Sequence, residues 1–171
     1  MKKLSLAVAI LGLAQPSIAF AQVAEKCIQP EQAAALISYI LPKAVEAAKS
    51  KCEPSLSIDS ALMEINSERL ASYQAASEAA WPKAKEAVNI IGGEKLPGDI
   101  DDTLLKPLAD AIFTGMITEE IKAKDCALID KIYTDLAPMP SSNIASLTVT
   151  IIQAATKDDK DANLPICKAP A

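Results

Sequence analysis

Histidine is absent from this sequence of 171 residues, and glycine occurs only five times. Histidine is the commonest acid–base catalyst and a frequent metal ligand, so its absence excludes the most familiar catalytic and zinc sites. The sequence also lacks a glycine-rich phosphate loop and any two cysteines at zinc-finger spacing. We therefore expect no metal and no cofactor, whereas carboxylate chemistry stays open.

Basic residues are too few for a nucleic-acid interface. The formal net charge is −5, and removal of residues 1–21 would take away only Lys2 and Lys3 among the charged residues, leaving −7. Phosphate backbones and anionic lipids bind surfaces rich in lysine and arginine. We therefore expect that the mature chain neither binds nucleic acid nor inserts stably into a membrane.

The first 21 residues have the three parts of a secretory signal peptide. Lys2 and Lys3 precede the apolar run Leu4–Leu13, and Ala19–Ala21 places small residues on either side of Phe20 at a cleavage site. Ten apolar residues are too few to span a membrane, which requires about 20. We expect a bacterial protein in the periplasm or the medium, with a single helical domain over 22–171.

Four cysteines follow the signal peptide, and an even number in an exported chain predicts two disulfides. A reactive thiol would need a base such as histidine, which the sequence lacks. The cysteines are Cys27, Cys52, Cys126 and Cys167. The last of these would hold down a C-terminal tail that we expect to be extended.

Proline and glycine divide the alanine-rich mature chain into helical segments, with bends expected at Pro42 and Pro82. Thr118 is the expected cap of the fourth segment. The segments run from Pro30 to about Lys51, from about Ser67 to Ile91, and over 103–117, 119–137 and 144–156. The third segment has an apolar stripe, expected to face the core, formed by Leu105, Leu108, Ile112 and Met116, and a polar stripe formed by Thr103, Lys106, Asp110 and Thr114.

The last segment is ambiguous, because Leu147, Val149 and Ile151 alternate with threonines as they would in a strand. A lone strand would leave its backbone groups unpaired, so we expect a helix. The predicted fold is a small all-α bundle of about five segments, stapled by two disulfides.

Two residues are weak candidates for function. Asp125 shares a helical face with apolar residues of the segment 119–137, and a carboxylate in such a place is a candidate catalytic acid, although structural acids occur there equally well. Trp81, the only tryptophan, precedes Pro82 and is a candidate groove residue, although a core position is more usual.

Pro42 decides between two disulfide pairings. If Pro30–Lys51 were one kinked helix about 33 Å long, Cys27 and Cys52 would lie at opposite ends, and the pairs would be Cys52–Cys126 and Cys27–Cys167. If Pro42 instead began a new helix folded back on the first, Cys27 would meet Cys52. We expect the second arrangement, with the pairs Cys27–Cys52 and Cys126–Cys167.

The favoured function is a non-catalytic helical binding or interaction module of the bacterial envelope, with an unknown protein or small molecule as its partner. Two alternatives stay open. One is a secreted inhibitor or immunity-type protein, and the other is a carboxylate-dependent enzyme acting on envelope glycans, with Asp125 as its acid.

We predict that the mature protein begins at Gln22, because cleavage after Ala21 satisfies the small-residue requirement of signal peptidase. Intact-mass measurement of protein from the envelope fraction will give the mature mass. Retention of residues 1–21 would contradict the export on which the disulfide prediction depends.

Overall fold

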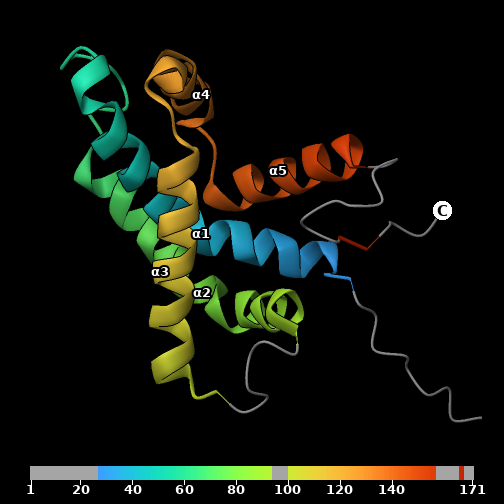
Figure 1. The fold of residues 1–171 in the computed structure, drawn as a ribbon. Helices are drawn as coiled ribbons and strands as arrows, with labels where there is room; N and C mark the ends of the chain where they lie inside the picture. The colour runs from blue at the N-terminus through green and yellow to red at the C-terminus, as the bar shows by residue number, and fades with distance from the viewer. Residues whose placement is uncertain (1–26, 94–99, 157–165, 168–171) are drawn as a thin grey trace, which may run out of the picture.

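Five α-helices make up most of the described structure, which confirms the predicted small, disulfide-stapled all-α bundle. The computed structural model describes residues 27–93, 100–156 and 166–167. In this part of the chain, α1 lies between α2 and α5, and α3 crosses α1 (Figure 1). The elements are α1 (Pro30–Cys52), η1 (Glu53–Ser55), α2 (Ser67–Gly92), α3 (Asp102–Glu120), η3 (Ala123–Asp125), α4 (Cys126–Leu136) and α5 (Ser141–Ala155).

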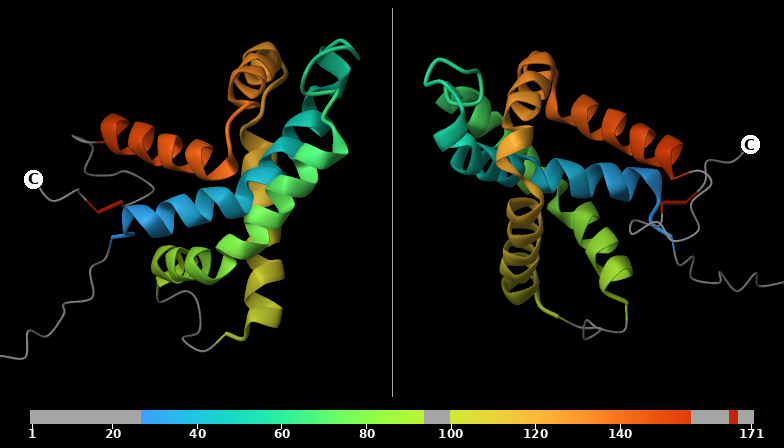
Figure 2. Two further views of the ribbon diagram at one scale, coloured as in Figure 1. Left: turned by 180° about the vertical axis from the view of Figure 1, so that it is seen from behind. Right: turned by 45° about the horizontal axis from the view of Figure 1, so that its top comes forward.

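Helices α1 and α2 run antiparallel, and each contains an internal proline, Pro42 or Pro82. Proline lacks a backbone N–H and its ring presses on the preceding turn, so both helices bend there without ending (Figure 2). In the turn before Pro42, the carbonyl of Tyr39 accepts a 2.7 Å hydrogen bond from the hydroxyl of Ser77 on α2. This buried bond fixes how the two bent helices lie against each other.

Tyr39 is the residue at which α1, α2 and α3 meet. Its fully buried ring lies against Trp81 of α2, with the ring centroids 4.8 Å apart. Its hydroxyl donates a hydrogen bond to Asp110 of α3, and the Nζ of Lys43 lies 3.3 Å from the same carboxylate. The surrounding core contains Ile28, Ala33, Leu36, Ala84, Ala87, Val88, Leu105, Ala109 and Val149.

Helix α3 is oriented differently from the prediction. Leu105 is buried, but the polar side chains of Lys106 and Asp110 also lie against α1 and α2, where Lys106 pairs with Glu78. These polar contacts hold the middle of the predicted polar stripe toward the body of the protein, whereas Thr103 and Thr114 at its ends are exposed. The rest of the predicted apolar stripe is therefore exposed, namely Leu108, Ile112 and Met116.

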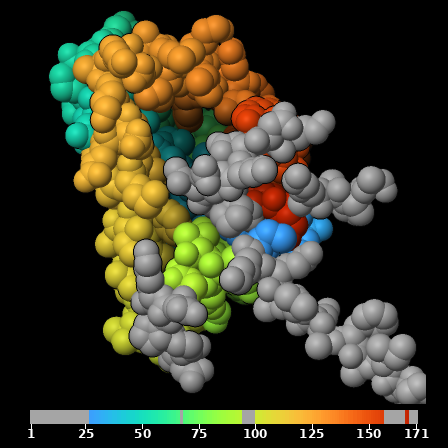
Figure 3. Space-filling view, turned by 45° about the vertical axis from the view of Figure 1, so that its right-hand side comes forward, coloured from blue at the N-terminus to red at the C-terminus, as the bar shows by residue number. Residues whose placement is uncertain are grey.

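The predicted helix over 119–137 is interrupted. Helix α3 continues through Thr118 to Glu120, so Thr118 does not cap a helix, and the chain then extends at Ile121 and Lys122 before η3 and α4. The apolar side chain of Ile121 packs beside Cys52 and Cys126. The turn at Ile121 thus lets α4, orange in Figure 3, lie over the end of α1.

The segment predicted over 144–156 is helical, and it lies within α5 except for Thr156, which caps the C-terminal end of that helix. Its threonines suit a helix because their hydroxyls bond within it: Thr148 donates to the carbonyl of Ile144 at 2.8 Å, and Thr150 to that of Ser146 at 2.9 Å. Val149 of α5 is buried in the main core. Packing of this face against α1 therefore outweighs the strand pattern.

The disulfides join Cys27 to Cys167 and Cys52 to Cys126, so the predicted pairing is wrong. The reason is that α1 continues through Pro42 for 23 residues, which corresponds to about 34 Å. Cys27 and Cys52 therefore lie at opposite ends of one helix and cannot approach each other. Two disulfides are typical of a non-reducing, extracytoplasmic compartment.

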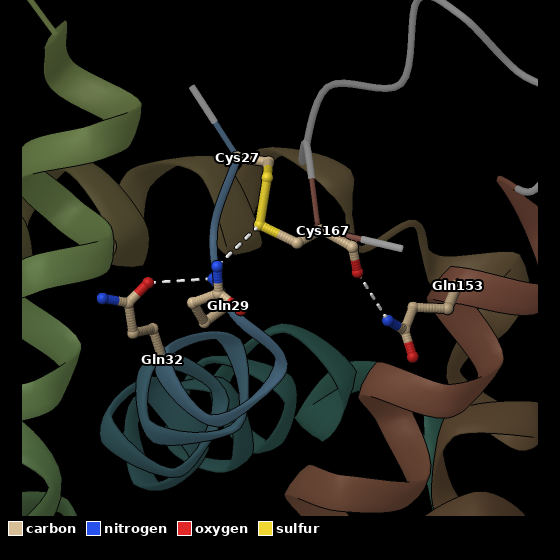
Figure 4. Close-up of a disulfide and its surroundings, with 5 residues drawn as sticks. All are labelled: Cys27, Gln29, Gln32, Gln153 and Cys167. Carbon is tan, nitrogen blue, oxygen red and sulfur yellow. Dashed lines mark hydrogen bonds between the residues drawn. A yellow bond between two sulfur atoms is a disulfide. The ribbon is translucent and has the colours of Figure 1, made fainter. Parts of the chain in front are cut away.

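The Cys27–Cys167 disulfide ties the two ends of the described chain together (Figure 4). The N–H of Cys167 donates a 2.8 Å hydrogen bond to the carbonyl of Ile28, and Gln153 of α5 donates a 3.1 Å bond to the carbonyl of Cys167. The N–H of Gln29 bonds to the side chain of Gln32 at 2.9 Å. Cys167 is thus held to α1 and α5 by backbone bonds as well as by sulfur.

Removal of the Cys52–Cys126 disulfide should destabilise the protein strongly. The cysteines are 74 residues apart, and release of a loop of this length costs about 4 kcal/mol in the chain-entropy model. Urea unfolding of the Cys52→Ala/Cys126→Ala variant measures this loss. Non-reducing peptide mapping should recover peptides linked through Cys52 and Cys126, and a linked pair of Cys27 with Cys52 would contradict the structure.

The protein should lose stability in alkaline solution through Tyr39. Burial and the Asp110 carboxylate raise the pKa of this hydroxyl far above its ordinary value of about 10. The unfolded chain then releases the Tyr39 proton first, so the free energy of unfolding falls as the pH rises above about 10. Denaturant unfolding at pH 8 to 12 gives the free energy of unfolding as a function of pH. This free energy should fall less steeply with pH in Tyr39→Phe than in the wild type, and the same slope in both proteins would contradict this cause.

Candidate functional site

An apolar groove lies between the second half of α1, the start of α2, and helices α4 and α5. Its volume is about 170 Å³, and part of the hollow is visible in Figure 3. Among the described residues, the groove lining contains no charged side chain. The lining consists of Leu41, Ala44, Val45, Ala48, Leu62, Tyr73, Ile129, Ile132, Tyr133, Leu136 and Ile144.

The groove is formed by the position of α4 beside α1. Cys126 at the start of α4 is bonded to Cys52, and Asp130 accepts a 2.8 Å hydrogen bond from the backbone N–H of Leu62. Helical spacing then places one face of α4 toward α1, formed by Ile129, Ile132, Tyr133 and Leu136. The facing residues of α1 after Pro42 are mostly small, so the two faces leave a space between them.

A polar pocket adjoins the apolar groove at Tyr73, whose side chain lines both. The pocket contains Arg69, one helical turn before Tyr73 on α2, and its lining also includes Asn66, Glu68, Ser72, Met139, Pro140 and Ser141. Burial raises the pKa of Tyr133, and the positive charge of Arg69 acts in the opposite direction. Arg69 is therefore close enough to act on a hydroxyl of the groove wall.

Trp81, the candidate groove residue, does not line the apolar groove. It is buried against Tyr39, and the Nζ of Lys106 lies 5.9 Å from the centre of its ring. Its indole nitrogen has no hydrogen-bond partner among the described residues. This position belongs to the main core.

Asp125, the candidate acid, lies at the end of η3 and is partly buried. Its carboxylate does not cap α4, although it directly precedes Cys126. Asp125 and Glu120 line a shallow pocket between α3 and α4. Glu120 is exposed, and the other residues of this pocket are apolar, so Asp125 has only one carboxylate near it in the pocket.

The outer face of α3 is a second apolar surface. Leu104, Leu108, Ile112 and Met116 follow one another at intervals of four residues, and all four are exposed. Such a continuous stripe on a surface helix is typical of interaction sites. It is a flat face, whereas the apolar groove is concave.

No group of three metal-ligating side chains occurs in the described part of the chain. None of the described helices is long and apolar enough to cross a membrane. Comparisons with protein families, with curated proteins and with solved structures found no significant match. The groove and its polar pocket are therefore interpreted from their own chemistry.

Arg69, Tyr73 and Tyr133 were not among the residues singled out from the sequence. The spacing of Arg69 and Tyr73 places them on one face of α2, and that signal was available. Tyr133 is 60 residues further along the chain than Tyr73, and only the turn at Ile121 brings α4 beside α2.

Proposed function

We propose that this chain is an exported, non-catalytic binding protein of the bacterial envelope and that the apolar groove is its ligand site. The signal-like N-terminus and the two disulfides support export. The groove supports binding, because its lining is apolar and the residues come from four different helices and a loop. This groove is the observation on which the proposal depends.

The size of the groove limits what it can hold. An engineered protein cavity of about 150 Å³ accommodates benzene, so a groove of about 170 Å³ accepts an apolar group of roughly that size. Complete small-molecule pockets are usually larger, at about 300 to 1,000 Å³. The groove therefore suits the apolar part of a ligand whose remaining atoms lie outside it.

The two alternative functions rest on other features. A secreted inhibitor or immunity-type protein would use a flat surface, for which the exposed stripe of α3 is suitable. A carboxylate-dependent enzyme would use Asp125, but its neighbour Glu120 is exposed and the shallow pocket is otherwise apolar. The concave, uncharged groove favours the binding protein over both.

The groove should bind a neutral apolar dye such as N-phenyl-1-naphthylamine, and filling it should abolish binding. Ala44→Phe places an aromatic ring in the groove, and we expect it to weaken dye affinity at least tenfold. The measurement is a fluorescence titration, with circular dichroism to verify folding.

The matched control is Ala75→Phe, an exposed position on α2 that does not line the groove. This variant should bind the dye like the wild type. Absence of dye binding to the wild type, or equal affinity in the wild type and Ala44→Phe, would contradict the groove as the ligand site.

A further inference from the structure

We infer that the ligand is a free single-chain carboxylate amphiphile, a medium-chain fatty acid, with its alkyl chain in the apolar groove and its carboxylate bound by Arg69. This inference rests on the proposed function, because it names the ligand of the same groove. The observation behind it is that one cation, Arg69, lines a polar pocket beside the uncharged apolar groove.

Arg69 is the only arginine of the chain, and within the described residues it forms no ion pair. Four lysines of the described part, by contrast, lie within 4 Å of a carboxylate. The backbone of Arg69 is fixed by a 2.7 Å hydrogen bond from its N–H to the side chain of Asn66. Arg69 is therefore a cation that lines the polar pocket, extends from a fixed backbone position and has no ion-pair partner among the described residues.

Tyr73 and Tyr133 of the groove wall offer hydroxyl groups beside the apolar space. Tyr73 lies one turn after Arg69 and lines both the groove and the polar pocket, and Tyr133 faces the groove from α4. A phenol can donate a hydrogen bond to a carboxylate while its ring contacts an alkyl chain. Phenols are protonated at neutral pH, because the ordinary pKa of tyrosine is about 10.

The start of α5 adds backbone N–H donors at the polar pocket. Ser141 and Pro140 line the polar pocket, and no described side chain caps the first turn of α5. The first backbone N–H groups of a helix carry partial positive charge and favour an anion. This contribution adds to that of Arg69.

The head group is best matched by a singly charged carboxylate. The planar guanidinium can bind both oxygens of a carboxylate through two parallel hydrogen bonds. Glu68 also lines the polar pocket, and its negative charge disfavours a doubly charged head group such as a phosphate monoester. A chain of about eight carbons would fill the groove and reach the pocket, given the benzene-sized volume of the groove.

The test compares octanoate, octanol and octyltrimethylammonium as competitors of the neutral dye in the wild type. Octanoate should bind at least tenfold more tightly than octanol, because charge-assisted hydrogen bonds to the carboxylate are absent from the alcohol. The cationic compound should compete most weakly.

The deciding variant is Arg69→Gln, which should weaken octanoate binding about ten- to hundredfold and leave octanol and dye binding unchanged. Arg69→Lys should recover part of the octanoate affinity. Lys83→Gln removes a positive charge from an exposed position on the same helix and should change neither affinity.

The outcomes separate this inference from the proposed function. Equal affinities for octanoate and octanol in the wild type, or an equal loss of both in Arg69→Gln, would overturn the carboxylate ligand and leave the groove as the ligand site. Loss of octanoate binding in Lys83→Gln as large as in Arg69→Gln would also overturn the specific role of Arg69. Absence of dye binding to the wild type would overturn the proposed function itself.

Discussion

The bend at Pro42 separates the two parts of this protein. Before the bend, α1 carries Leu36 and Tyr39 into the main core, where α2, α3 and α5 cover it. After the bend, Val45 and Ala48 face a space that α4 only partly closes. Because proline bends the helix without ending it, one helix supplies both the core and one wall of the groove. Because α1 continues through Pro42, Cys27 and Cys52 lie at its opposite ends and each pairs with a cysteine from elsewhere in the chain.

The groove remains open because its α1 wall consists mostly of small side chains and because two bonds fix the position of α4. Aromatic residues make up 4% of the sequence, and the wall formed by α1 includes two alanines. Meanwhile the Cys52–Cys126 disulfide and the hydrogen bond from the N–H of Leu62 to Asp130 hold α4 in place. The helices therefore cannot collapse onto the groove without breaking bonds that stabilise the rest of the fold. An apolar space kept open in this way exposes surface to water, and a ligand that covers it gains the corresponding free energy.

The local features of the fold were predictable, whereas its long-range contacts were not. Asp101 caps α3, and Gly93 follows the end of α2 with a positive φ of 49°, as helix-end rules lead one to expect. The orientation of α3 was wrongly predicted, because hydrophobic spacing carries no information about the ion pair between Lys106 and Glu78. The disulfide pairing failed for a similar reason, since the choice between a bent and a broken helix at Pro42 depends on how α2 packs against it. Tyr73 and Tyr133 lie on different helices, and only that packing brings them to one groove.

Ligand binding and stability are coupled in this architecture. Helix α4 is bonded to α1 at Cys126, and its later residues Tyr133 and Leu136 border the groove and pack against the cluster that contains Val45 of α1. The proposed ligand chain would add apolar contacts between α1 and α4 that exist only in the folded form, so it would bind that form and not the unfolded one. Any such ligand raises the free energy of unfolding by RT ln(1 + [L]/Kd), which is about 2.7 kcal/mol at a hundredfold excess over Kd. The stabilisation should be largest in the far half of α4, because the Cys52–Cys126 disulfide already restrains the near half. The groove is thus an incomplete part of the core that the proposed ligand would complete.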